Sequence, residues 1–439
     1  MRQIISELRK FAIPSTKIKN SKKRIAEKAF VLIKNQIENY PEIVGLEFGG
    51  SYAKDTWLPK EADIDIFIKF KKTTSEEKFV EISKKIGFDS MRKYNPCIRY
   101  SEHPYVEARI MKTKINIVPC YDVKLGEWQS SADRSPFHTK YMQNVLTSEM
   151  KNDVRILKAF LKLTKIYGAE IAKQGFSGYV SEVLILNFHS FENVIRSLAK
   201  IQSNQIIGKS SKLFETSVVI IDPVDSNRNL AAAISNENIG KFILACRFYE
   251  NNSALFFKSK LSKSSKNLWN NVLVVKFNFK MRSPDIIWGQ IKRTTTSLAT
   301  QLELGGFKVL RSKSYSDEQN EAYLFFLLES TSIPKNYCKF GPEFFRKDDS
   351  TSFISKNIAK TELMWIDDKK IVSLEKRKHS QAIKFMTELL NLQTVIPKGL
   401  QDDFNKGFKV SIGSKNLSKS IKEAVSDLIS TDGKIFHIN

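Results

Sequence analysis

Cysteine, long apolar runs and acidic residues are all scarce in this sequence. Its 439 residues include four cysteines, and no two of them form a C-x-x-C pair. This spacing gives no disulfide framework and no zinc motif, so we expect reduced thiols and a cytoplasmic protein. No run of about 18 apolar residues occurs, which argues against a membrane span. The short amphipathic start does not resemble a signal peptide.

The shortage of acidic residues leaves a large positive charge. Lys and Arg total 71 against 47 Asp and Glu, a formal net charge of +24. Such an excess costs self-repulsion unless a polyanion neutralises it, and nucleic acid is the obvious candidate, because neutralised phosphates release counterions. The alternative is a lysine-rich composition that serves solubility alone.

Length and patterning indicate three regions. At roughly 100–200 residues per domain, the chain allows about three domains. Helix and strand patterns alternate over residues 1–148, a helical pattern dominates 149–256, and both mix over 257–439, with no internal repeat. The polar, basic stretch 258–266 fits a loop near the last boundary. We therefore expect a multidomain protein with α/β and α+β parts.

The segment from Gly49 to Ile66, GGSYAKDTWLPKEADIDI, holds the groups that carry chemistry. Glycine lets the backbone approach a triphosphate closely, and the Ser51 hydroxyl and nearby N–H groups can donate to phosphate oxygens. Asp63 and Asp65 alternate in a predicted strand, so they share a face about 6–7 Å apart. Paired carboxylates beside a phosphate loop suit Mg²⁺ ions that promote nucleotidyl transfer. A lone D-x-D pair would more commonly be a solvated strand face.

The same segment resembles the signature of polymerase-β-type nucleotidyltransferases, most closely that of the archaeal (class I) CCA-adding enzymes, GSYARGTWL followed by an IDVF-like strand. Further motifs match in order between about Phe48 and Asn229: YSEHPYV, INIVPCY, ADRSPFH, VRILKAFLK, IYGAE, GFSGY and DPVDSNRN. The resemblance implies a polymerase-β-like nucleotidyltransferase head over 1–148, a helical neck that recognises the base over 149–256, and an α+β body and tail that bind tRNA over 257–439.

The activity implied by this resemblance is template-independent addition of C, C and A to the 3′ end of tRNA. CTP and ATP would be the substrates, Mg²⁺ the cofactor and pyrophosphate the second product. The tRNA would be held by its 3′ end and acceptor stem, and the resemblance is compatible with a homodimer.

The resemblance also assigns roles to single residues. Asp63 and Asp65 would bind the metal and take part in catalysis, with Asp63 standing where Glu is common in the family. Ser51 would contact the phosphates of the nucleotide. Lys54 stands where the family usually has Arg, which keeps the charge but loses the bidentate fork. The remaining nucleotide-binding residues would be His138, Lys158 and Tyr167 for the triphosphate and Arg228 for the base edge.

Without the resemblance, these residues have plainer interpretations. His138 would be a structural histidine, as would His103, which the resemblance places near the catalytic sheet. Lys158 would be a solvated helix lysine, Tyr167 an aromatic at the edge of a core, and Arg228 a surface arginine after a turn.

One departure from the family pattern concerns the third metal-binding carboxylate. Asn116 occupies its place in INIVPCY, and Asn offers a metal one neutral oxygen but no charge. Glu107 lies in the first arm of a predicted hairpin, opposite or diagonal to Asn116, so the two share a face. Our hypothesis is that Glu107 partly replaces the missing aspartate. The alternative is a solvated Glu107 that pairs with Arg109 or Lys114.

Two rival functions fit the same head. A poly(A)-adding or oligoadenylate-forming nucleotidyltransferase would share the metal site, but the HPYV, RSPFH and DPVDSNRN motifs argue against it. A catalytically impaired tRNA-binding homologue is supported by Asn116 alone. The retained Asp63 and Asp65 argue against that reading, since a pure binder needs no metal pair.

Overall fold

The computed structural model describes residues 8–100, 103–210, 212–258, 262–264, 266–415 and 417–436. The chain divides into two compact units, Met1–Leu261 with Asp432–Asn439, and Ser262–Thr431. Each unit has its own hydrophobic cores. Among the described residues, no helix combines the length and apolar character needed to span a membrane.

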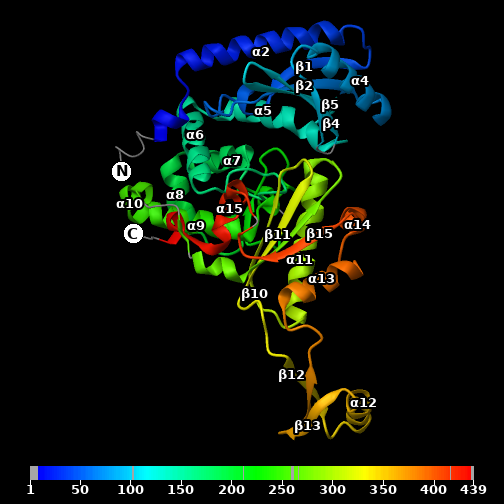
Figure 1. Ribbon diagram of the computed structural model, residues 1–439. Helices are drawn as coiled ribbons and strands as arrows, with labels where there is room; N and C mark the ends of the chain where they lie inside the picture. Colours follow the sequence, from blue (N-terminus) through cyan, green and yellow to red (C-terminus); the bar gives the residue numbers. More distant parts are fainter. Residues whose placement is uncertain are drawn as a thin grey trace. The chain divides into compact units, whose positions relative to one another are not determined.

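The first unit begins with a five-stranded sheet of order β1-β2-β5-β4-β3, in which β2 and β5 run parallel and the other neighbours antiparallel (Figure 1). Its strands are β1 (Ile43–Gly49), β2 (Ile64–Lys71), β3 (Cys97–Tyr100), β4 (Pro104–Ile110) and β5 (Thr113–Asp122). Helices α2 (Thr16–Ile37) and α4 (Glu76–Ser90) pack against Ile64 and Ile66 of β2. Because side chains alternate along a strand, Asp65 points to the opposite face.

Helices form most of the remainder of the first unit. They are α3 (Gly50–Ala53), α5 (Arg134–Val145), α6 (Ser148–Leu163), α7 (Gly178–Phe188), α8 (Phe191–Ala199), α9 (Asn236–Asn251), α10 (Ser253–Lys258) and α16 (Gly433–Phe436), with a parallel pair of short strands, β6 (Gln205–Ile207) and β7 (Val218–Ile220). Thr147 and Ser177 accept backbone N–H bonds at the starts of α6 and α7, which satisfies donors that a helix leaves unpaired. A cluster of aromatic rings around Phe160 fills the core between these helices.

The second unit contains two main sheets, beside a short two-stranded pairing of β8 with β16. The larger sheet has the order β10-β11-β9-β15, and helices pack against it. The smaller sheet has the order β12-β14-β13 and lies at the other end of the unit from β15 (Figure 1). The strands are β8 (Ser262–Ser264), β9 (Val272–Asn278), β10 (Val309–Ser316), β11 (Glu321–Leu328), β12 (Asn336–Glu343), β13 (Thr361–Asp367), β14 (Lys370–Lys376), β15 (Phe408–Ile412) and β16 (Ser430–Asp432). The helices are α11 (Pro284–Leu304), α12 (Lys347–Asn357), α13 (Ala382–Leu392), α14 (Lys398–Asn405) and α15 (Lys419–Ala424).

The structure confirms the predicted hairpin and corrects two details. Strands β4 and β5 form the hairpin, with Glu107 directly opposite Asn116. The strand predicted over ADIDIFIKF starts only at Ile64, because the Asp63 N–H donates within a turn to the Glu61 carbonyl. Strands β12 and β13 were not predicted individually from the sequence. In β12 and β13 no face is regularly buried, so neither shows the alternation that marks a strand.

Candidate active site

A row of polar side chains crosses the sheet face opposite α2 and α4. Asp65 of β2 pairs in register with Asn116 of β5, which pairs with Glu107 of β4. Asn116 Nδ2 donates to Asp65 Oδ1 at 2.8 Å. Glu107 is only 6% exposed, so its reading as a solvated residue is wrong. It accepts a hydrogen bond from Arg99 at 3.3 Å and lies 3.9 Å from Arg109.

The glycine turn after β1 lies directly against Asp65. Gly50 has a φ of 61°, a conformation that glycine adopts without steric cost. A Cβ atom on Gly50 would lie 1.8 Å from Asp65 Oδ2, so no other residue fits without displacement. Ser51 follows in α3. The turn predicted to bind phosphates and the central carboxylate therefore meet at one end of the sheet.

The oxygen atoms gathered here fit a divalent cation. Burial raises the pKa of the Asp65 carboxyl, opposed by the Asn116 hydrogen bond, and burial also raises the pKa of Asp63, where the charge of Asp65 adds to the shift. The Oδ1 atom of Asn116 is buried without a hydrogen-bond partner. Carboxylate and amide oxygens are ligands that hard cations accept. Among the described residues no three His, Cys, Asp or Glu side chains cluster as a metal site; the residue beside Asp65 in this row is an amide and is not of those types.

Two lysines predicted to bind the nucleotide, Lys54 and Lys158, share one buried carboxylate. Lys54 Nζ lies 2.5 Å from Glu182 Oε2, and Lys158 Nζ lies 3.5 Å from Glu182 Oε1. Thr56 Oγ1 donates to Glu182 Oε1 at 2.6 Å, and Lys158 donates to the Thr56 carbonyl at 2.9 Å. Lys158 is 1% exposed, so its reading as a solvated helix lysine is wrong. The cluster holds two positive charges against one negative charge.

Burial sets the protonation of this lysine cluster. Burial lowers the pKa of Lys158 to about 8, although Glu182 opposes the shift. For Glu182, burial alone would raise the pKa, but the ammonium groups of Lys54 and Lys158 hold it below its ordinary value. Arg155 fixes the adjoining loop by donating to the backbone carbonyls of Asp55 and Trp57. The lysines are therefore held in place before any ligand arrives.

A second cluster surrounds the buried carboxylate of Asp222. His138 Nε2 lies 3.0 Å from Asp222 Oδ2, and Arg228 Nη1 donates to the same oxygen at 3.2 Å. Tyr179 Oη donates to Asp222 Oδ1 at 2.8 Å, and its ring stacks on the His138 ring at 4.0 Å. His138, Tyr179 and Arg228 line a cavity of about 250 Å³. Lys54 Nζ lies 5.3 Å from the centre of the Tyr179 ring, which links this cluster to the lysines.

Tyr167 and His103 occupy different surroundings. A Cβ atom on Gly178 would come within 3.2 Å of Tyr167 Oη and 3.3 Å of Lys158 Nζ, so Tyr167 borders the lysine cluster. His103 instead lies 3.8 Å from Glu76 of α4 and contacts the Phe79 ring edge-on. Since α4 covers the face opposite Asp65, the structure separates His103 from the other candidate residues.

Four residues of these clusters were not singled out from the sequence. Thr56, Tyr179, Glu182 and Asp222 make the hydrogen bonds that connect the predicted residues. Tyr179 lies in the GFSGY motif and Asp222 in the DPVDSNRN motif, so these two motifs could have pointed to them from the sequence. Glu182, in an otherwise apolar helix, carries a charge that demands a buried partner.

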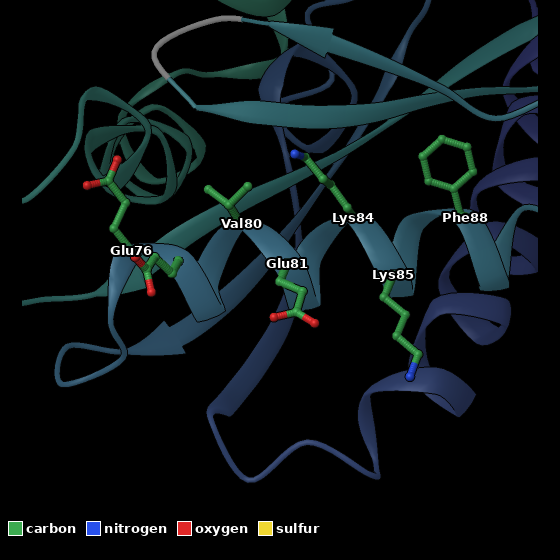
Figure 2. Close-up of a pocket in the computed structure, with 7 residues that line it drawn as sticks. Glu76, Val80, Glu81, Lys84, Lys85 and Phe88 are labelled. Carbon is green, nitrogen blue, oxygen red and sulfur yellow. The ribbon is translucent and has the colours of Figure 1, made fainter.

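A larger hollow of about 720 Å³ lies elsewhere, along α4. Figure 2 shows that its labelled side chains all come from this one helix and do not converge on a common point. No candidate residue lines it. We therefore place the site at the clusters around Asp65, Glu182 and Asp222.

Three family models match successive parts of the chain. A nucleotidyltransferase domain matches residues 32–139, the second domain of tRNA nucleotidyltransferase matches 152–258, and the C-terminal domain of CCA-adding enzyme matches 270–413. The first match confirms the nucleotidyltransferase head. Among solved structures, the Cid1 poly(U) polymerase bound to Mg 3′-dATP has 12% identity and a TM-score of 0.43, and covers 56% of this chain and 96% of that one.

Curated relatives match most of the chain. The CCA-adding enzyme of Pyrobaculum islandicum is 34% identical over 350 residues, which cover 79% of this chain and 83% of that protein. The CCA-adding enzyme of Saccharolobus shibatae is 32% identical over 365 residues, 82% of this chain and 86% of that protein. That of Sulfurisphaera tokodaii is 33% identical over 369 residues, with the same coverage. With this identity over most of the length of both chains, the protein belongs to the family of CCA-adding enzymes, the tRNA nucleotidyltransferases.

Proposed function

We propose that this protein completes the 3′ end of tRNA by adding C, C and A from CTP and ATP and releasing pyrophosphate. The observation that supports this most directly is the contact between the glycine turn and the Asp65 carboxylate. A turn that would bind phosphates beside a carboxylate of the kind that hard cations accept supports nucleotidyl transfer. Family membership supplies tRNA as the acceptor.

We infer a division of labour along the chain. Residues 1–148 would form the catalytic head and 149–256 the neck that recognises the base, while 257–439 would form the body and tail that bind the tRNA. The head and neck assignments are supported by hydrogen bonds that join Lys54 and Thr56 to Glu182.

Asp63, Asp65 and Asn116 would hold the divalent metals that nucleotidyltransferases generally use, and we propose Mg²⁺. When bound, Mg²⁺ neutralises charge on the α-phosphate and lowers the pKa of the attacking 3′-hydroxyl. Ser51 and the adjoining N–H groups would orient the phosphates.

The lysine cluster would hold the triphosphate. Among the described residues, its two ammonium groups contact only one carboxylate, that of Glu182. A phosphate oxygen would supply the second negative charge. Buried charges gain strongly from such pairing. Tyr167 and His138, at the edges of the cluster, would contact the same phosphates, and Arg228 would meet the base.

A second reading, a catalytically impaired tRNA-binding homologue, is favoured by one observation, the neutral side chain of Asn116. The intact lysine cluster and glycine turn favour an enzyme instead. A slow enzyme satisfies both observations.

The test is addition to a tRNA that lacks its 3′ CCA. CTP alone should extend it by two residues, CTP with ATP should give the complete end, and UTP or GTP should not substitute. Asp65→Ala should abolish addition while tRNA binding stays nearly intact, because the carboxylate lies in the catalytic row. Extension by ATP alone into long tails would favour the poly(A)-type rival, and tRNA binding with no addition at all would favour the impaired homologue.

A further inference from the structure

Asp222 lies at the centre of the cluster that lines the 250 Å³ cavity. It follows β7 and opens the turn DPVDSNRN. Its side chain is fully buried. Oδ1 accepts hydrogen bonds from Tyr179 Oη at 2.8 Å and from the Val224 N–H at 3.0 Å, while Oδ2 faces His138 Nε2 at 3.0 Å and Arg228 Nη1 at 3.2 Å. All four contacts are therefore made by donors.

The charge of this carboxylate fixes the orientation of its partners. The hydrogen bonds from His138 and Tyr179, against the effect of burial, hold the pKa of Asp222 below its ordinary value. An ionised carboxylate only accepts, so His138 must carry its proton on Nε2, and Nδ1 is the ring nitrogen left for a ligand. Arg228 uses Nη1 on Asp222, and its side chain is 42% exposed. A long, half-exposed arginine loses much of its freedom through this one charge-assisted bond.

We propose that Asp222 is the positioning residue for base selection: it holds the guanidinium of Arg228 at the angle that favours CTP and ATP over UTP and GTP. This inference rests on the proposed function, because it assumes that Arg228 meets the base. Asp222 itself touches no substrate. A fixed donor rejects a base edge that cannot pair with it, whereas a mobile donor adapts to several edges.

The direct test is Asp222→Asn, which keeps the shape and removes the charge. An amide has one acceptor oxygen in place of two and no charge, so it cannot accept from Tyr179, the Val224 N–H and Arg228 together, and the bond to Arg228 is weakened or lost. We expect the preference for CTP over UTP, as the ratio of kcat/KM values, to fall about tenfold, the lower range for losing a residue that orients a functional side chain. Binding of CTP and UTP to the complex with tRNA lacking CCA should show the same fall without any need for turnover. An unchanged ratio overturns the proposal.

A double-mutant comparison separates positioning from a general structural role. If Asp222 acts through Arg228, Asp222→Asn in an Arg228→Ala background should change the CTP preference no further. If Asp222 had only a structural role, Asp222→Asn would instead lower kcat/KM for all four nucleotides alike in both backgrounds. That result would contradict the proposal. The matched control is Asp225→Asn in the same turn. Asp225 pairs with Arg134 at 3.3 Å, and this variant should keep the preference.

A second variant covers the case in which Asp222→Asn fails to fold. Tyr179→Phe removes one hydroxyl that donates to Asp222 and leaves the ring stacked on His138. It should fold and show a smaller fall in CTP preference, and an unchanged preference in this variant overturns the proposal. Failure of the proposed function would look different, since the unaltered protein would then add no nucleotide to the tRNA and show no preference in binding.

Discussion

At the scale of single residues, we expect Asn116 to limit the rate of nucleotide addition. Its amide donates to Asp65 and leaves a buried oxygen unpaired. Replacing it with Asp would add an anionic ligand at the same place. We expect Asn116→Asp to strengthen metal binding by about 10–100-fold, the range for residues that tune a metal site, and to raise the rate of addition. A metal titration of the addition rate measures both effects, and an unchanged titration contradicts the prediction.

Glu107 tests whether the chain compensates for Asn116. It lies directly opposite Asn116 and is buried, but it is also bonded to Arg99, so the hypothesis of a substitute carboxylate stays a prediction. Glu107→Gln keeps the shape and should lower the rate about tenfold if the charge serves the metal. Glu47→Gln is the matched control, since Glu47 is a strand glutamate of the same sheet that pairs with Lys69. If Glu107→Gln and Glu47→Gln add nucleotides at equal rates, Glu107 has no role in catalysis.

Lys158 should make nucleotide binding depend on pH. Its pKa is lowered to about 8, chiefly by burial, so it loses its proton as pH rises through 8, and a neutral amine no longer attracts phosphate. CTP affinity should be constant below that range and fall by up to about tenfold per pH unit above it. Because the folded-state pKa lies below the unfolded one, stability changes in the opposite direction and rises with pH between about 8 and 10.5.

Calorimetric titration with CTP across this range measures the effect on affinity. Lys158→Met should remove the dependence, whereas Lys151→Met on the same helix should keep it. Burial also lowers the pKa of His138, below its ordinary value of about 6.5, so its titration does not overlap this range. A flat profile in the unaltered protein would mean that Lys158 does not meet the triphosphate.

At the scale of elements, the turn where β1 ends and α3 begins depends on Gly50. Gly50→Ala would place a Cβ atom 1.8 Å from Asp65 Oδ2 in a backbone with φ of 61°. The conformation alone costs about 1–2 kcal/mol, and displacement of the carboxylate by about 1 Å is expected to lower kcat/KM about a hundredfold. Thermal unfolding and addition assays measure the two effects. Gly45→Ala in β1 meets only a side-chain atom at 3.8 Å and serves as the control, so equal losses in both variants would contradict the role of the turn.

At the scale of the whole molecule, the net charge of +24 should govern tRNA affinity. Each phosphate neutralised by Lys or Arg releases counterions, so affinity falls as salt rises. For six or more contacts the loss is about a thousandfold between roughly 50 and 200 mM salt. Binding of tRNA to Asp65→Ala, in which no turnover interferes, gives the slope. If tRNA affinity did not change with salt concentration, the positive charge would reflect a lysine-rich composition and not RNA binding.

Local patterns in the sequence determined the chemistry of this protein and the elements that carry it. Alternation in ADIDIFIKF predicted the strand with Asp65, and the spacing of residues 105–119 predicted the hairpin with Glu107 opposite Asn116. Ordered motifs alone indicated the family. Such features depend on neighbours a few residues apart, where the periods of helix and strand leave a direct mark.

Only the tertiary structure decided which distant side chains meet. Lys54 reaches Glu182 across 128 residues of sequence, and His138 reaches Asp222 across 84. No local period links such positions, because their contact follows from how segments far apart in the sequence pack together within the first unit. The same holds for Lys158, which a helical pattern alone would leave in solvent and which the fold buries beside Glu182. Local sequence patterns thus identified the candidate groups, and packing placed the charges that we propose hold and select the nucleotide.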